Sequence, residues 1–261
     1  MQKVRYRREL TDFLRFVWRP RPGPRLPGRH ARNGVFEDFL PALSVWRILQ
    51  WALLLWAINL FIFGPMAVGA AQAGGAEHRL NIHSLPWLQA LIWAPIVEEL
   101  TFRFCLRRVG ALWWFVPLMA GILISGPGFA SGALVVVALL LVWAPTWSAR
   151  HRPAGAPTPR LAGVCSLSWV QRLRVRRFYP WLFHASALAF AAVHLYNFNL
   201  NQMPLSLMPL LVLPQWITGL VLGWIRVRRG IGASMLLHAV FNAGPLLVVL
   251  LILSYAPDLA G

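Results

Sequence analysis

Long apolar segments separated by short polar stretches run through most of this sequence. A helix needs roughly 20 apolar residues to cross a bilayer, and seven segments come near that length. They lie near residues 42–70, 85–106, 111–126, 132–146, 180–199, 204–225 and 231–256. The fourth is short, and it could form a hairpin with the third that enters only part of the way. The pattern predicts an all-α, polytopic transmembrane helical bundle of about seven spanning helices, with six or eight as the alternatives.

Residues 1–40 precede the first apolar segment and are rich in arginine. Apolar residues recur there at helical spacing, so we expect a short helix at the membrane interface, with its arginines against anionic headgroups. The residues of its apolar face are Leu10, Phe13, Leu14, Val17 and Trp18, and its arginines are Arg7, Arg8, Arg15 and Arg19. The prolines that follow should end this helix. The chain therefore divides into a basic cytoplasmic arm, residues 1–40, and a transmembrane domain, residues 41–261.

Composition and charge give the class and the orientation. Hydrophobic residues make up 58% of the chain and charged residues 13%, which is typical of a membrane protein. If the chain alternates through seven spans, 22 of its 25 basic residues fall on the side of the N-terminus, and the opposite side receives only Arg79. The positive-inside rule then predicts a multi-pass protein of the cell (inner) membrane with a cytoplasmic N-terminus. The net charge of +17 could indicate nucleic acid binding, but the arginines flank membrane segments, so we expect no nucleic acid partner.

Two adjacent carboxylates lie within the second apolar segment. Glu98 and Glu99 are conspicuous because the chain has only 8 acidic residues and a carboxylate at membrane depth costs roughly 2.5–3.5 kcal/mol. Glu99 and Arg103 are four residues apart and project from one helix face, so they can form a purely structural ion pair. That pair would leave Glu98 without an explanation.

Two other apolar segments carry polar side chains. His194 follows Phe190 in the fifth, where a lone histidine is more often a packed, hydrogen-bonded residue than a catalyst. His238 and Asn242 lie one turn apart in the last segment, where both can donate to one oxygen or merely join helices. The three polar groups together are much less expected by chance than any one of them.

The three groups resemble the ordered motifs of the CPBP family, the CAAX proteases and bacteriocin-processing enzymes, also called the Abi family, of glutamic-type intramembrane endopeptidases. The motifs are Glu98-Glu99-x-x-x-Arg103, Phe190-x-x-x-His194 and His238-x-x-x-Asn242, with Gly223-Trp224-Ile225-Arg226-x-Arg228-x-Gly230 leading into the third. The similarity covers roughly Leu85 to Gly244 and leaves out the N-terminal arm.

The resemblance implies an intramembrane endopeptidase that hydrolyses a peptide bond of a membrane-associated protein or peptide. Glu98 would be the general base that activates water, assisted by His194. His238 and Asn242 would stabilise the oxyanion, and Glu99 with Arg103 would hold Glu98 in place. We expect no cofactor and no metal.

Alternatives remain open at this stage. Glu98, His194 and His238 could instead bind a zinc ion with one open position. A noncatalytic membrane protein of the same fold, in bacteriocin immunity or as a scaffold, could share the helices. A proton-coupled transporter could use the same acid and histidines, although the chain shows no internal repeat. Candidate substrates are a prenylated CAAX-type C-terminus, a leader peptide and the membrane-embedded tail of a sorted protein, and the oligomeric state stays open.

The depth of the candidate residues is uneven. Glu98 and His238 lie about eight residues, or roughly 12 Å, from the expected cytoplasmic ends of their helices, whereas His194 would lie about 15 residues deep if its helix started at Pro180. We therefore expect that helix to start later, with His184 in the interface and outside the site, or to be tilted or broken. The active site should then lie in the cytoplasmic half of the membrane.

Overall fold

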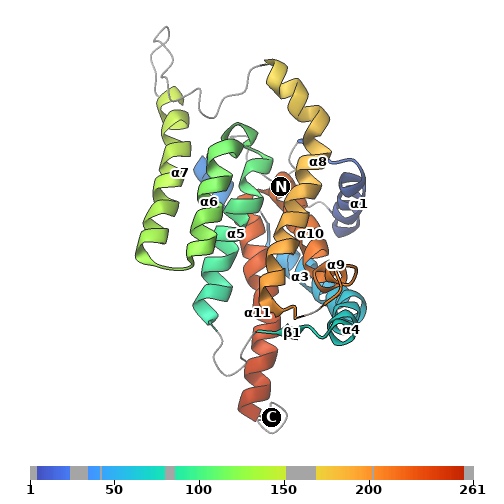
Figure 1. The fold of residues 1–261 in the computed structure, drawn as a ribbon. Coiled ribbons are helices and arrows are strands. Elements are labelled where there is room, and N and C mark those ends of the chain that lie inside the picture. The colour runs from blue at the N-terminus through green and yellow to red at the C-terminus, as the bar shows by residue number, and fades with distance from the viewer. Residues whose placement is uncertain are drawn as a thin grey trace.

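The computed structural model describes residues 5–23, 35–41, 43–79, 86–150, 169–201 and 203–255. Helices make up nearly all of this part of the chain, as Figure 1 shows. They are α1 (Tyr6–Trp18), α2 (Val35–Phe39), α3 (Val45–Ile58), α4 (Gly64–Gly74), α5 (Ala94–Phe102), α6 (Leu112–Ser125), α7 (Phe129–Arg150), α8 (Trp169–Val193), α9 (Met208–Leu211), α10 (Leu213–Arg229) and α11 (Ile231–Tyr255). Two short strands, β1 (Glu77–His78) and β2 (Phe198–Asn199), pair antiparallel. The prediction of an all-α fold is confirmed.

Within the described ranges, three helical stretches are long and apolar enough to cross a membrane: Val45–Gly74, Leu173–Asn197 and Ile231–Tyr255. A fourth span results if Gln89–Leu106 and Val109–Ser125, which are bent by 112° relative to each other, count as one. Every segment expected from the sequence contains helix, but seven spans are not confirmed. The reason is length, since stretches such as Phe129–Ala144 fall short of the roughly 20 residues that one crossing takes.

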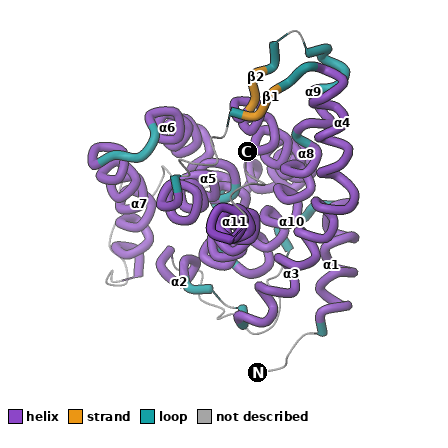
Figure 2. Tube along the Cα trace, turned by 90° about the horizontal axis from the view of Figure 1, so that it is seen from below, coloured by secondary structure: helices purple, strands orange, loops and turns teal. Residues whose placement is uncertain are grey.

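Helix α11 lies at the centre of the bundle. Viewed along its axis in Figure 2, it is surrounded by α3, α5 and α10, while α6 and α7 form a separate hairpin at one edge. The main core joins α3, α8, α10 and α11, and α10 is the most enclosed helix because every residue from Thr218 to Arg229 is buried. Close packing of this kind needs small residues at the contacts. A Cβ added at Gly232, at the start of α11, would lie only 1.8 Å from the carbonyl oxygen of Phe39.

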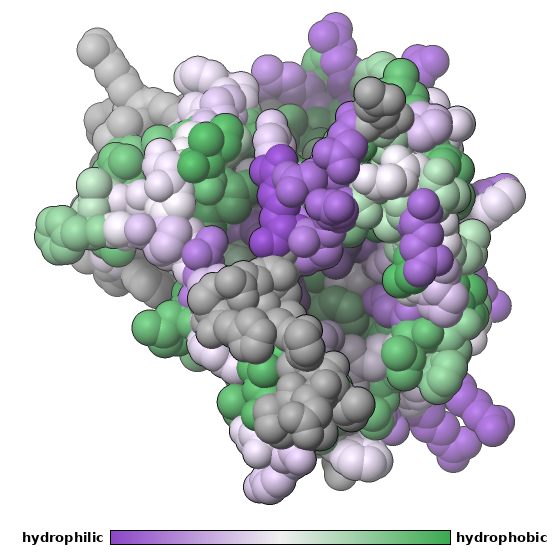
Figure 3. Space-filling view, turned by 60° about the horizontal axis from the view of Figure 1, so that its bottom comes forward, coloured by the Kyte–Doolittle hydropathy of each residue, from purple (hydrophilic) through white to green (hydrophobic). Residues whose placement is uncertain are grey.

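The strand pair lies near the lower end of the bundle in Figure 1. Its exposed residues are polar, and Arg79, which follows β1, donates from Nε to Asn199 Oδ1 at 2.7 Å. Figure 3 brings this end forward and shows hydrophilic side chains gathered between areas of apolar surface. The expected basic side of the membrane is the opposite end of the molecule, where α8 and α11 begin.

Prolines interrupt two helices at π-helical turns. Such a turn occupies Asn59–Phe63 before α4 and Gln89–Trp93 before α5, and each is followed by a helix with proline in its first turn. Proline has no N–H and its ring crowds the preceding turn, so the backbone widens locally and bonds to the fifth residue back. The second of these turns leads directly into the helix that carries Glu98.

The N-terminal arm contains the expected helix, but α1 packs on protein. Tyr6, Leu10, Phe13 and Val17 lie against the main core, and Phe16, which the apolar pattern did not single out, is buried. Leu14 and Trp18 point away and are 61% and 83% exposed. Residues 1–4 and 24–34 of the arm lie outside the described residues, and its place at the membrane interface stays a prediction.

Three acidic residues of the arm pair with the arginines at the end of α10. Glu9 pairs with Arg229, Asp12 with Arg228 at 2.8 Å, and Asp38 with Arg226 at 2.7 Å. Arginines counted in the sequence as exposed membrane flanks are therefore buried ion-pair partners. The arm and the end of α10 form one packed unit.

The expectation that the helix of His194 begins after Pro180 is wrong. Helix α8 starts at Trp169 and runs unbroken to Val193 with Pro180 inside it. Ser186 donates to the carbonyl oxygen of Phe102, which places this point of α8 beside the last turn of α5. His194 lies eight residues beyond Ser186, directly after the end of α8, and its depth in the membrane stays a prediction. His184 bonds through Nε2 to the carbonyl oxygen of Val17 at 3.1 Å and lies outside the site.

Candidate active site

Three helices bring the sequence motifs together. Glu98 and Glu99 come from α5, His194 follows the last residue of α8, and His238 and Asn242 come from α11. Phe190 of α8 connects them, since its ring lies 4.7 Å from that of His194 and 5.7 Å from that of His238. The residues of all three motifs therefore meet in one place.

The predicted pairing of Glu99 with Arg103 is confirmed. Arg103 Nη1 donates to Glu99 Oε1 at 3.0 Å, and neither side chain is exposed. The guanidinium carbon of Arg103 lies 3.6 Å from the ring centre of Phe190, in the position of a cation–π contact. Both charges of the pair are therefore compensated inside the bundle.

Glu99 also holds His238, which the sequence did not predict. Nδ1 of His238 lies 3.0 Å from Glu99 Oε1, and the hydroxyl of Ser234 bonds to Glu99 Oε2. A carboxylate paired with arginine can only accept hydrogen bonds, so the hydrogen is on Nδ1. Ser234 precedes His238 by one helical turn, and this spacing on one helix face is the signal that could have identified it.

Glu98 lies on the other side of the His238 ring. Its Oε2 atom is 3.8 Å from His238 Nε2, too far for a direct hydrogen bond. Among the described residues this buried oxygen has no hydrogen-bond partner, although the side chain as a whole is 14% exposed. Glu98 therefore keeps one carboxylate oxygen without a hydrogen bond, whereas both oxygens of Glu99 are hydrogen-bonded.

His194 is oriented by its own helix. Its Nδ1 lies 2.8 Å from the carbonyl oxygen of Phe190, so Nδ1 carries a hydrogen and Nε2 is left as an acceptor. The ring is close enough to Glu98, His238 and Arg103 for their charges to act on it. The ring is therefore held with Nε2 as the nitrogen that remains free to accept a hydrogen bond.

Asn242 makes a hydrogen bond that gives it a structural role. Its Nδ2 donates to the carbonyl oxygen of Ala90 at 2.9 Å. That carbonyl stands in the π-helical turn, where the N–H of Ala94 bonds to Gln89 and Pro95 has no N–H to offer. Asn242 supplies the missing donor with one of its two N–H groups, and the second stays available.

The end of α5 is fastened by side chains from other helices. The last carbonyls of a helix have no donor within it and need outside partners. Ser186 bonds to the carbonyl of Phe102, Arg226 donates to those of Arg103 (3.1 Å) and Phe104 (3.0 Å), and Tyr179 donates to that of Leu106 (3.0 Å). These four bonds lie within two turns of Glu98 and fix its depth and direction.

The zinc alternative needs a group of ligands. Within the ranges that the structure describes, no three His, Cys, Asp or Glu side chains are grouped closely enough to hold a metal ion. Glu98, His194 and His238 therefore do not form such a group in this arrangement.

One family model matches the chain. It is described as type II CAAX prenyl endopeptidase Rce1-like, and it matches residues 161–244. The curated proteins and the solved structures gave no match. The matched segment contains His194, His238 and Asn242, and Glu98 and Glu99 lie before it.

The fold and the family match are both consistent with a membrane-bound protease. Apolar helices long enough to cross a bilayer are those of a membrane protein, and the matched family is one of proteases. Helix α5, which lies outside the match, contributes its two glutamates to the same cluster as the matched histidines. Residues 161–244 are thus similar to the Rce1-like type II CAAX prenyl endopeptidases, in agreement with the resemblance of the sequence motifs to the CPBP (Abi) family.

Proposed function

We propose that this chain is a glutamic-type intramembrane endopeptidase that hydrolyses a peptide bond of a membrane-associated protein or peptide. The observation that carries the proposal is the buried Oε2 atom of Glu98, which has no hydrogen-bond partner among the described residues and lies 3.8 Å from His238 Nε2. A buried carboxylate without a partner is costly in a bundle, so a catalytic use is the simplest reason to keep it.

Glu98 acts as the general base. It takes a proton from a water molecule, whose oxygen attacks the carbonyl carbon of the substrate peptide. Nε2 of His194 accepts a hydrogen bond from the same water and orients it, because its Nδ1 hydrogen is already engaged by Phe190. When the tetrahedral intermediate collapses, the C–N bond breaks and Glu98 returns the proton to the leaving amine nitrogen.

His238 and Asn242 receive the negative charge that develops on the carbonyl oxygen. With a hydrogen on each ring nitrogen, His238 donates from Nδ1 to Glu99 and from Nε2 into the site. The second N–H of Asn242 is the other donor.

Glu99 and Arg103 serve the site through His238. The sequence suggested that this pair would hold Glu98, but the bonds of Glu99 go to Arg103, His238 and Ser234. The pair therefore positions the histidine that stabilises the oxyanion, in the way that an orienting carboxylate fixes a catalytic imidazole. The position of Glu98 is set instead by the hydrogen bonds that other helices make to the end of α5.

Orientation and localisation follow from charge. We infer that the ends of α8 and α11 nearest their N-termini face the cytoplasm, because the arginine-rich segments lie there. The protein is then a multi-pass protein of the cell membrane with its N-terminal arm in the cytoplasm. The site then lies in the cytoplasmic half, with Glu98 about one turn from the end of α5.

Peptide-bond cleavage without metal is the test of this proposal. Purified protein in detergent is incubated with lipid-anchored and transmembrane reporter peptides, and products are identified by mass spectrometry. We expect cleavage of at least one reporter to continue after treatment with a strong chelator. Activity that disappears with the chelator and returns only with Zn²⁺ would assign Glu98, His194 and His238 to a metal site instead.

A further inference from the structure

The outward face of α1 carries arginines that are not neutralised by any group in the described part of the chain. The side chains of Arg15, Arg19 and Arg21 are exposed, and within the described ranges they make no hydrogen bond or ion pair. The two acidic residues of α1 are fully used elsewhere, Glu9 by Arg229 and Asp12 by Arg228. The helix therefore presents positive charge outward and keeps its negative charge against the bundle.

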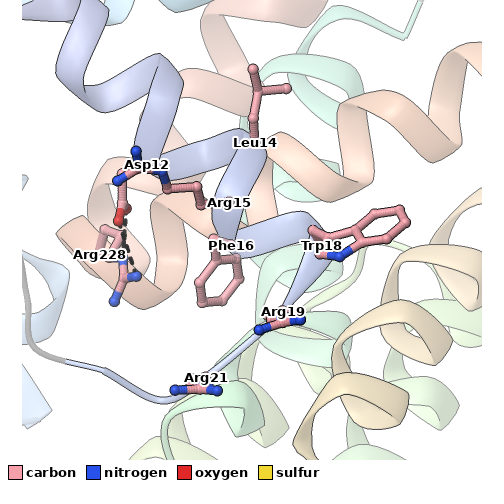
Figure 4. A pocket seen from close by; sticks show the side chains of 8 residues that line it. All are labelled: Asp12, Leu14, Arg15, Phe16, Trp18, Arg19, Arg21 and Arg228. Carbon is pink, nitrogen blue, oxygen red and sulfur yellow. Dashed lines mark hydrogen bonds and ion pairs between the residues drawn. The ribbon is translucent and has the colours of Figure 1, made fainter.

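These arginines line a pocket. It has a volume of about 750 Å³, within the roughly 300–1,000 Å³ of sites for small molecules. Figure 4 shows Arg19 and Arg21 below Phe16 and the Asp12–Arg228 pair beside it. Since Asp12 offsets Arg228, the other three arginines leave the pocket an excess of three positive charges.

The pocket is fixed in shape by its inner wall. The guanidinium of Arg228 lies 4.9 Å from the ring centre of Phe16 and donates to Asp12 at 2.8 Å and 3.2 Å. Asp12 also accepts from Trp224 Nε1 at 2.8 Å. A Cβ at Gly23 would approach Arg228 Nη1 to 2.9 Å, so the chain after α1 runs closely past that arginine. The Asp12–Arg228 pair is thus held in place by packed side chains, whereas Arg15, Arg19 and Arg21 are exposed.

The position of α1 beside the membrane spans indicates which kind of anion can reach the pocket. The helix lies beside the membrane spans, because Tyr6 packs its ring on Trp51 of Val45–Gly74 and Val17 bonds to His184 of Leu173–Asn197. Trp18 and Leu14, both on the pocket wall, are among the exposed apolar residues. Arginine beside exposed tryptophan is typical of the layer where lipid headgroups meet acyl chains.

We propose that this pocket binds the phosphate headgroup of an anionic phospholipid, with Trp18 and Leu14 against its acyl chains. Guanidinium groups bind phosphate oxygens through paired N–H donors, which suits a pocket lined by three exposed arginines. The lipid would tie the N-terminal arm to the cytoplasmic leaflet. This inference does not depend on the proposed peptidase activity.

The test uses the full chain in detergent, titrated with dioleoylphosphatidylglycerol and, separately, dioleoylphosphatidylcholine. Binding is measured by native mass spectrometry. The variant Arg15→Gln/Arg19→Gln/Arg21→Gln removes the three free charges and leaves the Asp12–Arg228 pair intact. The matched control, Arg174→Gln/Arg176→Gln/Arg177→Gln, removes three exposed arginines of α8 that do not line the pocket.

We expect the wild type to prefer phosphatidylglycerol, and the pocket variant to bind it roughly 10-fold or more weakly. The α8 control should stay within about two-fold of the wild type. All variants should keep the wild-type melting temperature because the substituted side chains are exposed; Arg19→Gln alone gives a second, milder comparison.

Three results would overturn the proposal. Equal weakening by both triple variants would indicate diffuse attraction without a site. No preference over phosphatidylcholine, together with binding of inorganic phosphate at the same arginines, would indicate a free phosphate. Tighter binding of a glutamate-rich peptide than of phosphatidylglycerol, lost in the pocket variant, would indicate an acidic protein partner.

Discussion

At the scale of single residues, the two adjacent glutamates have opposite surroundings. Glu99 is engaged by Arg103, His238 and Ser234, whereas one oxygen of Glu98 has no partner in the described part of the chain. Helical geometry explains this, since neighbouring residues project about 100° apart and reach different helices. Adjacent acids in a membrane helix can therefore divide into a structural and a reactive member.

Asn242 tests whether the site is catalytic. Replacing it by alanine should slow turnover by about 10²–10³, the usual loss for one oxyanion donor, and should leave KM nearly unchanged. It also removes the donor to Ala90, which should cost only about 1 kcal/mol of stability. Turnover and melting temperature are measured on the same preparation.

The control for Asn242→Ala is Asn59→Ala. Asn59 also joins two helices, because its Nδ2 donates a hydrogen bond to Thr218 Oγ1 at 3.3 Å, but Asn59 lies outside the site. We expect Asn59→Ala to change stability by a similar amount and turnover little. If both variants lose stability and neither loses turnover per folded molecule, Asn242 only joins helices.

At the scale of elements, the sequence predicted the helices better than the hydrogen bonds and ion pairs that hold them together. The apolar segments each contain helix, and the period of apolar residues in the arm matches α1. The π-helical turns could have been inferred from Pro65 and Pro95, because proline removes a backbone donor. Partners distant in sequence gave no such signal, since nothing local links Asp38 to Arg226.

The contacts of Arg226 allow the contribution of such bonds to stability to be measured. Arg226 is fully buried, donates to the carbonyl oxygens of Arg103 and Phe104, and forms an ion pair with Asp38. Lysine has a single nitrogen and cannot reach all three, so Arg226→Lys should lower stability by about 2–4 kcal/mol. Turnover should fall as well, because the end of α5 then loosens near Glu98.

Thermal unfolding in detergent measures this loss. The control Arg174→Lys changes an exposed arginine on α8 and should leave the melting temperature unaltered. A melting temperature equal to the wild type for Arg226→Lys would mean that the bonds to the end of α5 contribute nothing to stability.

At the scale of the whole molecule, the N-terminal arm is part of the bundle. The sequence suggested a helix apart from the transmembrane domain, and its apolar spacing could not distinguish a lipid surface from a protein surface. Glu9 decides the matter, since it is buried and contacts Arg229, Arg47 and Trp51. The face of α1 that carries Glu9 therefore packs on protein.

Replacing Glu9 by glutamine should therefore destabilise the whole protein. It leaves Arg229, which is 5% exposed, without its carboxylate, and breaking a buried pair costs about 3–5 kcal/mol. For a chain of this size we expect the melting temperature to fall by roughly 6–15 °C. The comparison is Glu77→Gln, an exposed acid on β1, which should change it little. Equal melting temperatures for the two variants would show that α1 is not docked on the bundle in solution.

The central claim is that Glu98 is the base of a peptide hydrolase, and Glu98→Gln tests it most directly. Glutamine keeps the shape of the side chain and removes its basicity, which should cost on the order of 10²–10⁴ in turnover. Because one oxygen of Glu98 has no protein partner among the described residues, the melting temperature should stay at the wild-type value. The account predicts a folded, inactive protein; wild-type turnover by purified Glu98→Gln would contradict it.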